Sequence, residues 1–550
     1  MSRLLVDVVL VVLAGVGLWL SFPAWDLWWL LVPSMALVIS RVDCSSPSRA
    51  AFLAMVFGCA FWLPHTDWSL PATGGWLPWV ALAGSQVVFL ALWGAATALT
   101  RVWQWSRHPL GEALAVATTW VAVEQVRSHF PWSGFPWGNL AYPQVDAPIG
   151  RLAVVGGEVL VSFLVVVVAV LARRALAMHV GLERPGWWSR PLCLVGALAL
   201  FVTPILIPLS QSQESGALRV GIAQGNIELP ALQTYSEEGR VTRNHADQMQ
   251  SLIDEGAPVD LYVWGEASLD RDPRRSAVVA HTVSDVVNRA QAPTIVGFPE
   301  YGEDFRYNWI GLWYPGTGLD PTFYGKQIPV PFGEFIPLRD IISLLATEAA
   351  QVSVDLAPVD NIAFMRVRLA DGRDVPLAVG ICFEVAYEDL LAEGVMAGGQ
   401  MIVVPTNNYH FRDRAESVQQ AQILRFRAME FSRSAVQAST TGVSMLVRPD
   451  GSVQAVSGTM QAAHLAGELP LRTSLTPAAV LGPWPSWLVM CAGAVLVLAS
   501  MARLVQVRFE DRAARGRRFA GAAGSAGRGD RGSSRRSSAS TGRGSVRSGQ

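Results

Sequence analysis

Three residues of the chain have side chains and local settings that suit nucleophilic catalysis. Glu266 directly follows the apolar run Leu261–Trp264 and its glycine, and Cys382 follows the apolar run 375–381. Lys326 stands in a short turn-like stretch. A carboxylate can take the proton of a thiol, an ammonium can stabilise an oxyanion, and a thiolate can attack a carbonyl carbon. Together the three residues predict one nucleophilic site, although each alone is also typical of a loop acid, a surface lysine and a core cysteine.

Lys326 is the only lysine among the 43 lysine and arginine residues of the sequence. The chain therefore uses arginine wherever a general cation is sufficient. Only lysine offers a compact point charge with a pKa that its surroundings can shift, whereas arginine is planar and always charged. This usage favours a chemical role for Lys326 over a general surface role.

The residues around these three form a pattern of short apolar runs that alternate with longer helical stretches. We predict strands at 218–222, 261–264, 294–298, 375–381 and 401–405, and a helix at 417–431. Several of these runs end directly in polar residues, which is where α/β folds gather their chemistry. The region 217–474 is therefore predicted to be one α/β domain.

The remainder of the 550-residue chain has the composition of a membrane protein. The sequence is 51% hydrophobic and only 16% charged, and it contains 21 tryptophans. Its five cysteines show neither a disulfide pattern nor a metal-ligand cluster. Apolar stretches predict eight membrane spans, at 4–22, 27–40, 51–64, 76–100, 111–126, 152–172, 191–209 and 478–502.

Basic residues indicate how these spans are oriented, because short cytoplasmic loops are enriched in lysine and arginine. Arginines at 3, 41, 49, 101, 107, 173, 174, 184 and 190 alternate with loops that contain few or none. We therefore expect both termini in the cytoplasm and the α/β domain outside it. The predicted organisation is a membrane domain of about seven helices at 1–209, the α/β domain at 217–474 and a final span at 478–505. A disordered Arg/Gly/Ser-rich tail is expected at 506–550, with a topological role rather than nucleic-acid binding.

With these motifs, the sequence resembles the nitrilase superfamily of carbon–nitrogen hydrolases and, more closely, the apolipoprotein N-acyltransferase family. The resemblance covers almost the whole chain except the tail. It rests on the strings SFP at 21–23, EQVR at 124–127, GFPWGN at 134–139, QGN at 224–226, VPFGEFIP at 330–337 and RFRAME at 425–430. It implies a multi-pass helical membrane domain in a bacterial cell membrane and an extracytoplasmic nitrilase-like domain folded as an α-β-β-α sandwich.

The resemblance also implies roles for individual residues. Glu266 would be the general base, Lys326 the oxyanion stabiliser and Cys382 the nucleophile. The resemblance further implies supporting residues for these three and candidates for substrate binding. The supporting residues are Glu334, Glu384 and Phe383, whose backbone amide would serve the oxyanion hole, and the substrate-binding candidates are Tyr235, Asn407 and Tyr409.

The reaction implied by the resemblance has two half-reactions. A phospholipid donates an acyl chain to Cys382, and the resulting thioester acylates the N-terminal amine of a diacylglyceryl-cysteine lipoprotein. No metal or organic cofactor is expected. Two other functions remain open: a membrane-tethered amidase with water as the acceptor, and a scaffold for a separate polyprenol-phosphate glycosyltransferase.

Two features of the helical half remain open at the sequence level. The segment 134–139 is typical of an interfacial turn with anchoring aromatic residues, although it would also suit the floor of a lipid entrance. Glu124 and Arg127, three residues apart on a predicted helix, are expected to pair with each other or with lipid headgroups.

Overall fold

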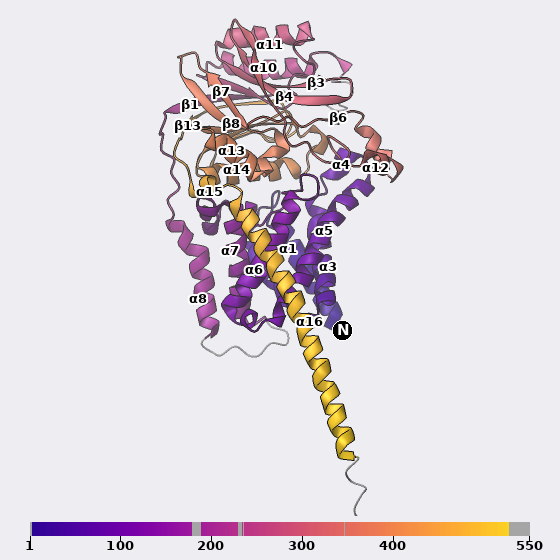
Figure 1. The fold of residues 1–550 in the computed structure, drawn as a ribbon. Helices are drawn as coiled ribbons and strands as arrows, with labels where there is room; N and C mark the ends of the chain where they lie inside the picture. Colours follow the sequence, from indigo (N-terminus) through magenta and orange to yellow (C-terminus); the bar gives the residue numbers. More distant parts are fainter. Residues whose placement is uncertain are drawn as a thin grey trace, which may run out of the picture. The chain divides into compact units, whose positions relative to one another are not determined.

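The computed structural model describes residues 3–43, 45–178, 189–228, 234, 236–345 and 347–526. The chain divides into two compact units, residues 1–497 and residues 498–550. The first unit contains both the helical half and the α/β domain (Figure 1).

Helices occupy the positions of the predicted spans in the N-terminal half. They are α1 (Arg3–Leu20), α2 (Leu31–Val42), α3 (Pro47–His65), α4 (Ser69–Thr73), α5 (Trp76–Leu99), α6 (Pro109–His129), α7 (Ala153–Ala175) and α8 (Ser189–Val202). Across the described residues, six helical segments are long and apolar enough to cross a bilayer, and α16 (Trp484–Ala526) supplies one of them. Two predicted spans differ from these six: α2 is short, and α6 carries buried charged residues that lower its hydropathy.

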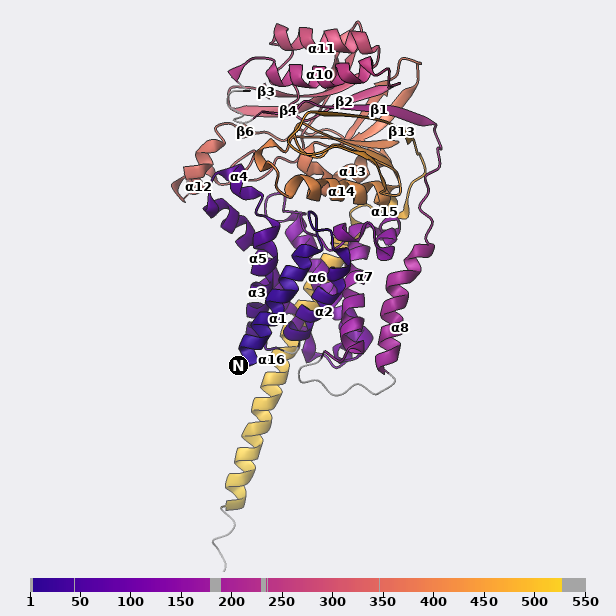
Figure 2. The same ribbon diagram turned by 180° about the vertical axis from the view of Figure 1, so that it is seen from behind.

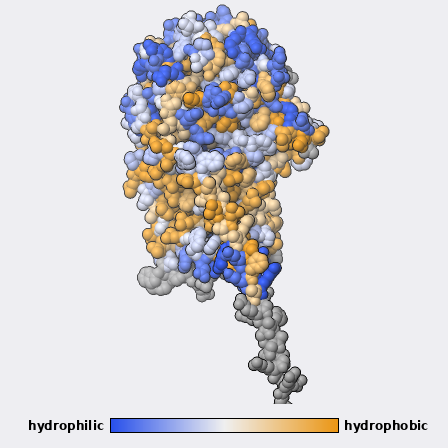
Figure 3. Space-filling view, viewed as in Figure 1, coloured by the Kyte–Doolittle hydropathy of each residue, from blue (hydrophilic) through white to orange (hydrophobic). Residues whose placement is uncertain are grey.

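The outer surface of the helical half is strongly apolar. Large side chains point outward, and Leu92, Leu192 and Leu206 are exposed by 56%, 73% and 80%. In Figure 3, hydrophobic residues cover the helical half, whereas hydrophilic residues gather over the α/β domain. Apolar patches of this extent are rare on soluble monomers and mark a membrane surface.

The arginines used to predict orientation do not all stand free in loops. Arg101 and Arg173 both pair with the buried carboxylates of Asp43 and Glu112, and Arg174 also pairs with Glu112. These residues come from α5, α6, α7 and the end of α2, so they join four helices at one end of the bundle. Pairing offsets part of the large cost of removing charges from water.

The α/β domain is built on two sheets. Among the described residues, the first has seven strands in the order β13-β1-β2-β3-β4-β5, with β6 paired to β4. These strands are β1 (Ala217–Gln224), β2 (Leu261–Trp264), β3 (Thr294–Tyr301), β4 (Phe305–Tyr314), β5 (Gly318–Gly325), β6 (Asp355–Leu356) and β13 (Ala463–Pro470). Strands β1, β2 and β3 are parallel, with Ile222 opposite Val263 and Val263 opposite Ile295.

The second sheet has six described strands in the order β12-β11-β10-β9-β8-β7. They are β7 (Phe364–Arg368), β8 (Asp374–Val379), β9 (Met401–Thr406), β10 (Ser434–Ser439), β11 (Met445–Val447) and β12 (Val453–Val456). Strands β8, β9 and β10 are parallel, with Val403 opposite both Val379 and Val436. Each sheet therefore has three parallel strands at its centre, and their carboxyl ends are the natural place for a site.

Helices cover the outer faces of both sheets. In Figures 1 and 2, α10 (Arg240–Asp254) and α11 (Ala277–Ala290) cover the first sheet, and α13 (Glu388–Met396) and α14 (Glu416–Phe431) cover the second. The predicted α-β-β-α sandwich is therefore confirmed. Helix α12 (Arg339–Leu345) lies outside the sandwich, beside α4 in both views.

Helix α14 joins the sandwich to the helical half. It packs against α7 and against the short 3₁₀ helix η8 (Cys382–Ala386). The amide oxygen of Gln419 accepts hydrogen bonds from Trp68 at 3.1 Å and from Trp137 at 2.7 Å, both in the helical half. The two halves thus share a polar and aromatic interface.

The C-terminal region differs from its predicted boundaries. The final span was expected at 478–505, but a short helix α15 (Pro477–Leu481) comes first and α16 begins at Trp484. Helix α16 continues to Ala526, so the structure has residues 506–526 as helix where the sequence predicted a disordered tail. Alanine and arginine are good helix formers, and they are frequent in this stretch. The remaining tail, 527–550, lies outside the described residues.

Candidate active site

The three residues singled out in the sequence meet at the edge where the two sheets face each other. Glu266 follows β2, Lys326 follows β5, and Cys382 begins η8 three residues after β8. The Lys326 ammonium lies 3.3 Å from Glu266 Oε1, and the charges of both groups act on the Cys382 thiol. Lys326 is only 1% exposed and Cys382 only 8%. The structure therefore brings an acid, a cation and a thiol into one buried cluster.

The backbone at Cys382 holds the thiol at a sharp turn. Its φ is 56°, in the left-handed region that residues other than glycine seldom adopt. The strand prediction placed Cys382 directly after an apolar strand, whereas β8 ends at Val379 and the chain turns into η8. Residues in such strained conformations cluster at functional sites. The turn places the side chain of Cys382 where the charges of Glu266 and Lys326 act on its thiol.

Two predicted supporting carboxylates hold Lys326 and the turn at Cys382 in place. Glu334 Oε1 lies 2.7 Å from Lys326 Nζ, and its Oε2 accepts a hydrogen bond from Val330 N at 2.8 Å. Glu384 connects the two sides of the site. It accepts hydrogen bonds from the backbone N–H groups of Ile381 at 2.7 Å, Gln327 at 2.6 Å and Ile328 at 3.0 Å, and from the Tyr324 hydroxyl at 2.9 Å.

Burial controls the protonation of the cluster. Burial, together with the charge of Glu266, raises the pKa of the Cys382 thiol well above its ordinary value. Burial also raises the pKa of Glu266, against the opposing charge of Lys326. Although burial alone would lower it, the carboxylates of Glu266 and Glu334 raise the pKa of Lys326, so the amine stays charged. The resting site therefore holds a thiol that needs a base, with a carboxylate and an ammonium beside it.

Comparison with known proteins gives the family. An apolipoprotein N-acyltransferase of Mycolicibacterium smegmatis is 31% identical over 530 residues, which cover 92% of this chain and 86% of that protein. The chain belongs to the apolipoprotein N-acyltransferase family. A second family member, from Azotobacter vinelandii, is 29% identical over 92% of this chain and 95% of its own. The model of the apolipoprotein N-acyltransferase N-terminal domain matches residues 14–171.

Among solved structures, an amidase from Nesterenkonia sp. AN1 is similar to the α/β region. It is 14% identical, the match covers 48% of this chain and 94% of the amidase, and the TM-score is 0.35. The family assignment does not depend on this likeness.

The segment 134–139 of this N-acyltransferase-family chain contacts the residue after the nucleophile. The Phe383 ring stacks on Trp137 and Phe135, with centroid distances of 5.7 Å and 6.0 Å. Gly134 and Gly138 have φ values of 71° and 73°, which fold this loop tightly. The segment is thus more than an interfacial turn, since it forms an aromatic wall next to Cys382.

The expected pair of Glu124 and Arg127 is not formed among the described residues. Arg127 instead donates to the carbonyl oxygens of Phe135 at 2.5 Å and Trp137 at 2.7 Å. Glu124 accepts from Trp120 Nε1 at 3.2 Å and from Leu140 N at 3.1 Å. Both side chains therefore brace the loop that carries the aromatic wall.

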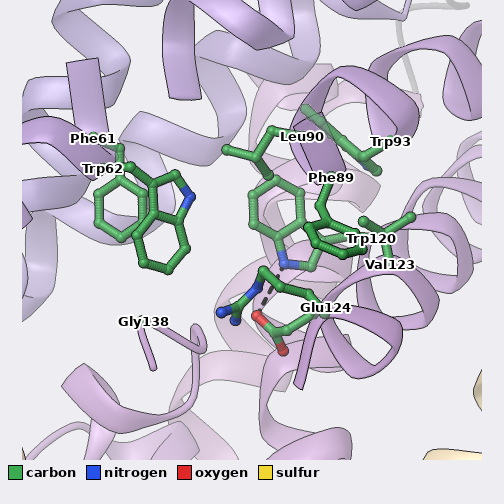
Figure 4. A pocket seen from close by; sticks show the side chains of 10 residues that line it. Phe61, Trp62, Phe89, Leu90, Trp93, Trp120, Val123, Glu124 and Gly138 are labelled. Atoms are coloured by element: carbon green, nitrogen blue, oxygen red, sulfur yellow. Dashed lines mark hydrogen bonds between the residues drawn. The ribbon is translucent and has the colours of Figure 1, made fainter. Parts of the chain in front are cut away.

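A pocket lies among α3, α5 and α6 below this loop (Figure 4). Its lining is mainly aromatic, with Glu124 and Arg127 as its charged members. Figure 4 shows Trp120 beside Glu124, with Gly138 on the opposite edge. Gly138 directly follows Trp137 in the loop 134–139, so the pocket and the aromatic wall share one segment.

The structure describes two of the three predicted substrate-binding residues. Asn407 and Tyr409 lie on the loop that leaves β9 directly after Thr406, and Asn407 Oδ1 accepts from Tyr409 N at 3.3 Å. The Tyr409 ring packs against His410, with a centroid distance of 3.6 Å. Tyr235 lies outside the described residues. The binding roles of all three remain predictions.

Two residues near the cluster were not identified from the sequence. Asn308 on β4 donates a hydrogen bond from Nδ2 to Glu266 Oε1 at 2.6 Å. Glu416, the first residue of α14, is buried beside the cluster. A polar residue inside the aromatic strand Phe305–Tyr314 was the signal for Asn308. Within the described residues, no group of three or more His, Cys, Asp or Glu side chains is arranged to hold a metal ion.

Proposed function

We propose that this chain transfers a fatty acyl group from a phospholipid, through a thioester on Cys382, to the N-terminal amine of a diacylglyceryl-cysteine lipoprotein. Glu266 is the general base, Lys326 the oxyanion stabiliser and Cys382 the nucleophile. The proposal is supported above all by the burial of these three side chains in one cluster. Membership of the N-acyltransferase family supports the choice of an amine, rather than water, as the acceptor.

In the first half-reaction, Glu266 takes the proton from Cys382 and the sulfur attacks the ester carbonyl of a phospholipid. The carbonyl oxygen becomes an oxyanion, which Lys326 Nζ and the Phe383 backbone N–H stabilise. When the tetrahedral intermediate collapses, the carbon–oxygen bond breaks and Glu266 returns the proton to the leaving alkoxide. Thioester and lysophospholipid are the products.

A base is needed because the raised pKa of Cys382 keeps the sulfur protonated at neutral pH. The raised pKa of Glu266 makes it a stronger base than an exposed glutamate. The difference between the pKa of Glu266 and that of the Cys382 thiol is therefore smaller. Glu334 and Glu384 support the chemistry by holding Lys326 and the turns on either side of Cys382.

The helical half is proposed to deliver the lipid. The aromatic pocket below the loop 134–139 offers apolar surface near the aromatic wall at Phe383. An acyl chain that packs against this apolar surface would be removed from water, which is favourable by about 0.8 kcal/mol for each CH₂ group. An amidase acting on small soluble amides would have no use for this arrangement.

For the topology, we propose cytoplasmic termini and an extracytoplasmic α/β domain in a bacterial membrane. The arginine-rich end of the helices supports this, because it lies opposite the end that contacts α14. A separate polyprenol-phosphate glycosyltransferase remains a proposed partner at the cytoplasmic face.

The test is intact mass spectrometry of the purified full-length protein after incubation with phospholipid vesicles. We expect one acyl adduct, mapped to Cys382, that hydroxylamine removes and that is absent in Cys382→Ala. Addition of a diacylglyceryl-cysteine lipopeptide should then move the acyl group to its amine. An adduct on another residue would refute the proposed nucleophile, and release of free fatty acid without acylated peptide would identify a hydrolase.

A further inference from the structure

A second carboxyl group lies next to the nucleophile and has no part in the steps above. Glu416 is only 4% exposed, and its Oε2 accepts a hydrogen bond from Asn408 Nδ2 at 2.7 Å. In the part of the chain that the structure describes, no donor contacts its Oε1. A buried carboxyl with one free oxygen is costly unless a ligand or a function compensates.

A hydrogen-bond network connects Glu416 to the backbone at Glu266. Asn408 Nδ2 also donates to Gln420 Oε1 at 2.7 Å, and Gln420 Oε1 accepts from the Thr406 hydroxyl at 3.1 Å. The carbonyl oxygen of Thr406 in turn accepts a hydrogen bond from the backbone N–H of Glu266 at 3.3 Å. Glu416 is therefore held by the same framework as the cluster of Glu266, Lys326 and Cys382.

The network also leaves one amide donor unpaired among the described residues. Gln420, one helical turn after Glu416, is fully buried, yet its Nε2 has no acceptor among the described residues. Asn408 is held from its other side by Ser439, whose hydroxyl donates to Asn408 Oδ1 at 2.8 Å. Glu416 therefore offers a carboxylate that Asn408 holds in place, which suits an ammonium group.

The second half-reaction, in which the thioester acylates an amine, needs a group that accepts a proton from that amine. An N-terminal amine has a pKa of about 8, so near neutral pH it arrives mainly as an ammonium ion that cannot attack a thioester. Glu266 and Lys326 already serve the sulfur and the oxyanion. One proton must leave the ammonium before the attack, and a second must leave the nitrogen during it.

We propose that Glu416 binds the acceptor's α-ammonium group and takes its first proton. This proposal rests on the proposed N-acyltransferase function and deepens it. The neutral amine then attacks the thioester carbonyl, so that the carbon–nitrogen bond forms and the carbon–sulfur bond breaks. Glu266 accepts the second proton from nitrogen and passes it to the sulfur, which leaves an amide, the Cys382 thiol and a protonated Glu416 that releases its proton to solvent.

The electrostatics of Glu416 agree with this role. Burial raises the pKa of Glu416 to about 8, with Asn408 opposing the rise and the charge of Glu266 adding to it. The titratable groups that interact with it are Glu266 and Cys382. This pKa matches that of the amine, so the transfer of a proton between the two groups is nearly balanced. Glu416 takes the proton in its ionised form, which is the minor form near neutral pH and increases as the pH rises.

The experiment separates the two half-reactions in the full-length protein. Acyl-enzyme is formed with phospholipid vesicles, the lipid is removed, and a diacylglyceryl-cysteine lipopeptide is added. Glu416→Gln, which keeps the shape and an acceptor for Asn408, should form the thioester within about threefold of the normal rate. Transfer to the lipopeptide should slow on the order of a hundredfold, as for loss of a general base. The deficit should shrink as the pH rises above the pKa of the amine.

Hydroxylamine provides a discriminating nucleophile, because it is already neutral near pH 7 and needs no first deprotonation. It should discharge the thioester of Glu416→Gln at the normal rate. The matched control is Glu468→Gln, an exposed carboxylate on β13, for which all three rates should be unchanged.

Each outcome has one meaning. Normal transfer to the lipopeptide in Glu416→Gln would overturn the proposed role of Glu416 and leave the proposed function intact. Equal slowing with hydroxylamine would also overturn it, because the effect would then be on the geometry of the site. Failure of the unaltered protein to form a thioester would instead refute the proposed function.

Discussion

Replacing Lys326 by arginine tests whether the site needs a compact cation rather than positive charge. Lys326 Nζ lies 3.3 Å from Glu266 and 2.7 Å from Glu334, and the side chain is 1% exposed. A guanidinium is planar and binds carboxylates through two parallel N–H bonds. In Lys326→Arg the guanidinium would bind Glu334 and Glu266, and its N–H groups would no longer point at the carbonyl oxygen of the substrate.

Lys326→Arg is expected to slow the reaction and, separately, to lower folding stability. Removal of one oxyanion donor typically slows reaction by about 10² to 10³, or roughly 3 to 4 kcal/mol in the barrier. Fitting a larger side chain into a filled site typically costs about 1–3 kcal/mol of folding stability. Lys326→Met is the matched comparison. It leaves the buried carboxylate of Glu266 and the partly buried one of Glu334 without their cation, which should cost about 3–5 kcal/mol.

The assay is single-turnover thioester formation, followed by mass spectrometry, with thermal unfolding of the same detergent-solubilised samples. We expect Lys326→Arg to remain folded and to form thioester at least a hundredfold more slowly. Lys326→Met should unfold at a lower temperature than Lys326→Arg. Acylation within tenfold of normal in Lys326→Arg would refute the reasoning, because a general cation would then be sufficient.

Three further predictions concern the base, the interface and the topology. Thioester formation requires ionised Glu266, and burial raises the pKa of this carboxyl above the ordinary glutamate value of about 4.3. The rate of thioester formation should therefore begin to fall with decreasing pH before a pH of about 4.3 is reached. A rate that stays constant down to about pH 4 would contradict this. Arg427→Met should lower unfolding stability by about 3–5 kcal/mol in denaturant titrations, because Glu158 and Glu430 would lose their buried cation. A periplasm-active reporter fused after residue 330 should be active and one after residue 520 inactive; equal activity would refute the proposed topology.

The strands that carry the site could be predicted because they are buried on both faces. The runs at 261–264 and 401–405 are continuous apolar stretches, as expected for central parallel strands. The structure has β2 at Leu261–Trp264 and β9 at Met401–Thr406. The helix predicted at 417–431 is α14, which begins one residue earlier, at Glu416. The pattern of apolar residues was sufficient to predict these elements because each of them is almost wholly buried.

The turn at Cys382 could not be predicted in the same way. The apolar run continues through Gly380 and Ile381, so sequence pattern extends the strand to the cysteine. The structure instead ends β8 at Val379, because Glu384 captures the Ile381 N–H at 2.7 Å and closes the turn. A contact of this kind depends on side-chain direction, which hydrophobic periodicity does not report.

Asn308 and Glu416 were missed for a related reason. An acid in the first turn of a helix is ordinarily explained by the helix dipole, so Glu416 has no distinctive sequence signal. Asn308 stands in a strand rich in aromatic residues, but only the structure shows that its amide donates to Glu266 at 2.6 Å. In both cases burial, rather than residue type, distinguishes the group.

The interface between the two halves explains why one chain contains both. Arg427 is fully buried and donates to the carbonyl oxygens of Ala386 at 2.8 Å and Val385 at 3.2 Å, at the end of the turn that begins with Cys382. The same guanidinium pairs with Glu158 of α7 at 2.9 Å. From the other side, Phe383 stacks on Trp137.

These contacts fix the nucleophile's turn to the helical half at both of its ends. A separate α/β domain would leave the Arg427 cation without Glu158 and expose the aromatic face of Phe383 to water, both of which are unfavourable. The turn at Cys382 is therefore positioned by the helical half of the chain. An acyl donor that stays in the bilayer can then meet a thiol whose orientation does not depend on the motion of a separate domain.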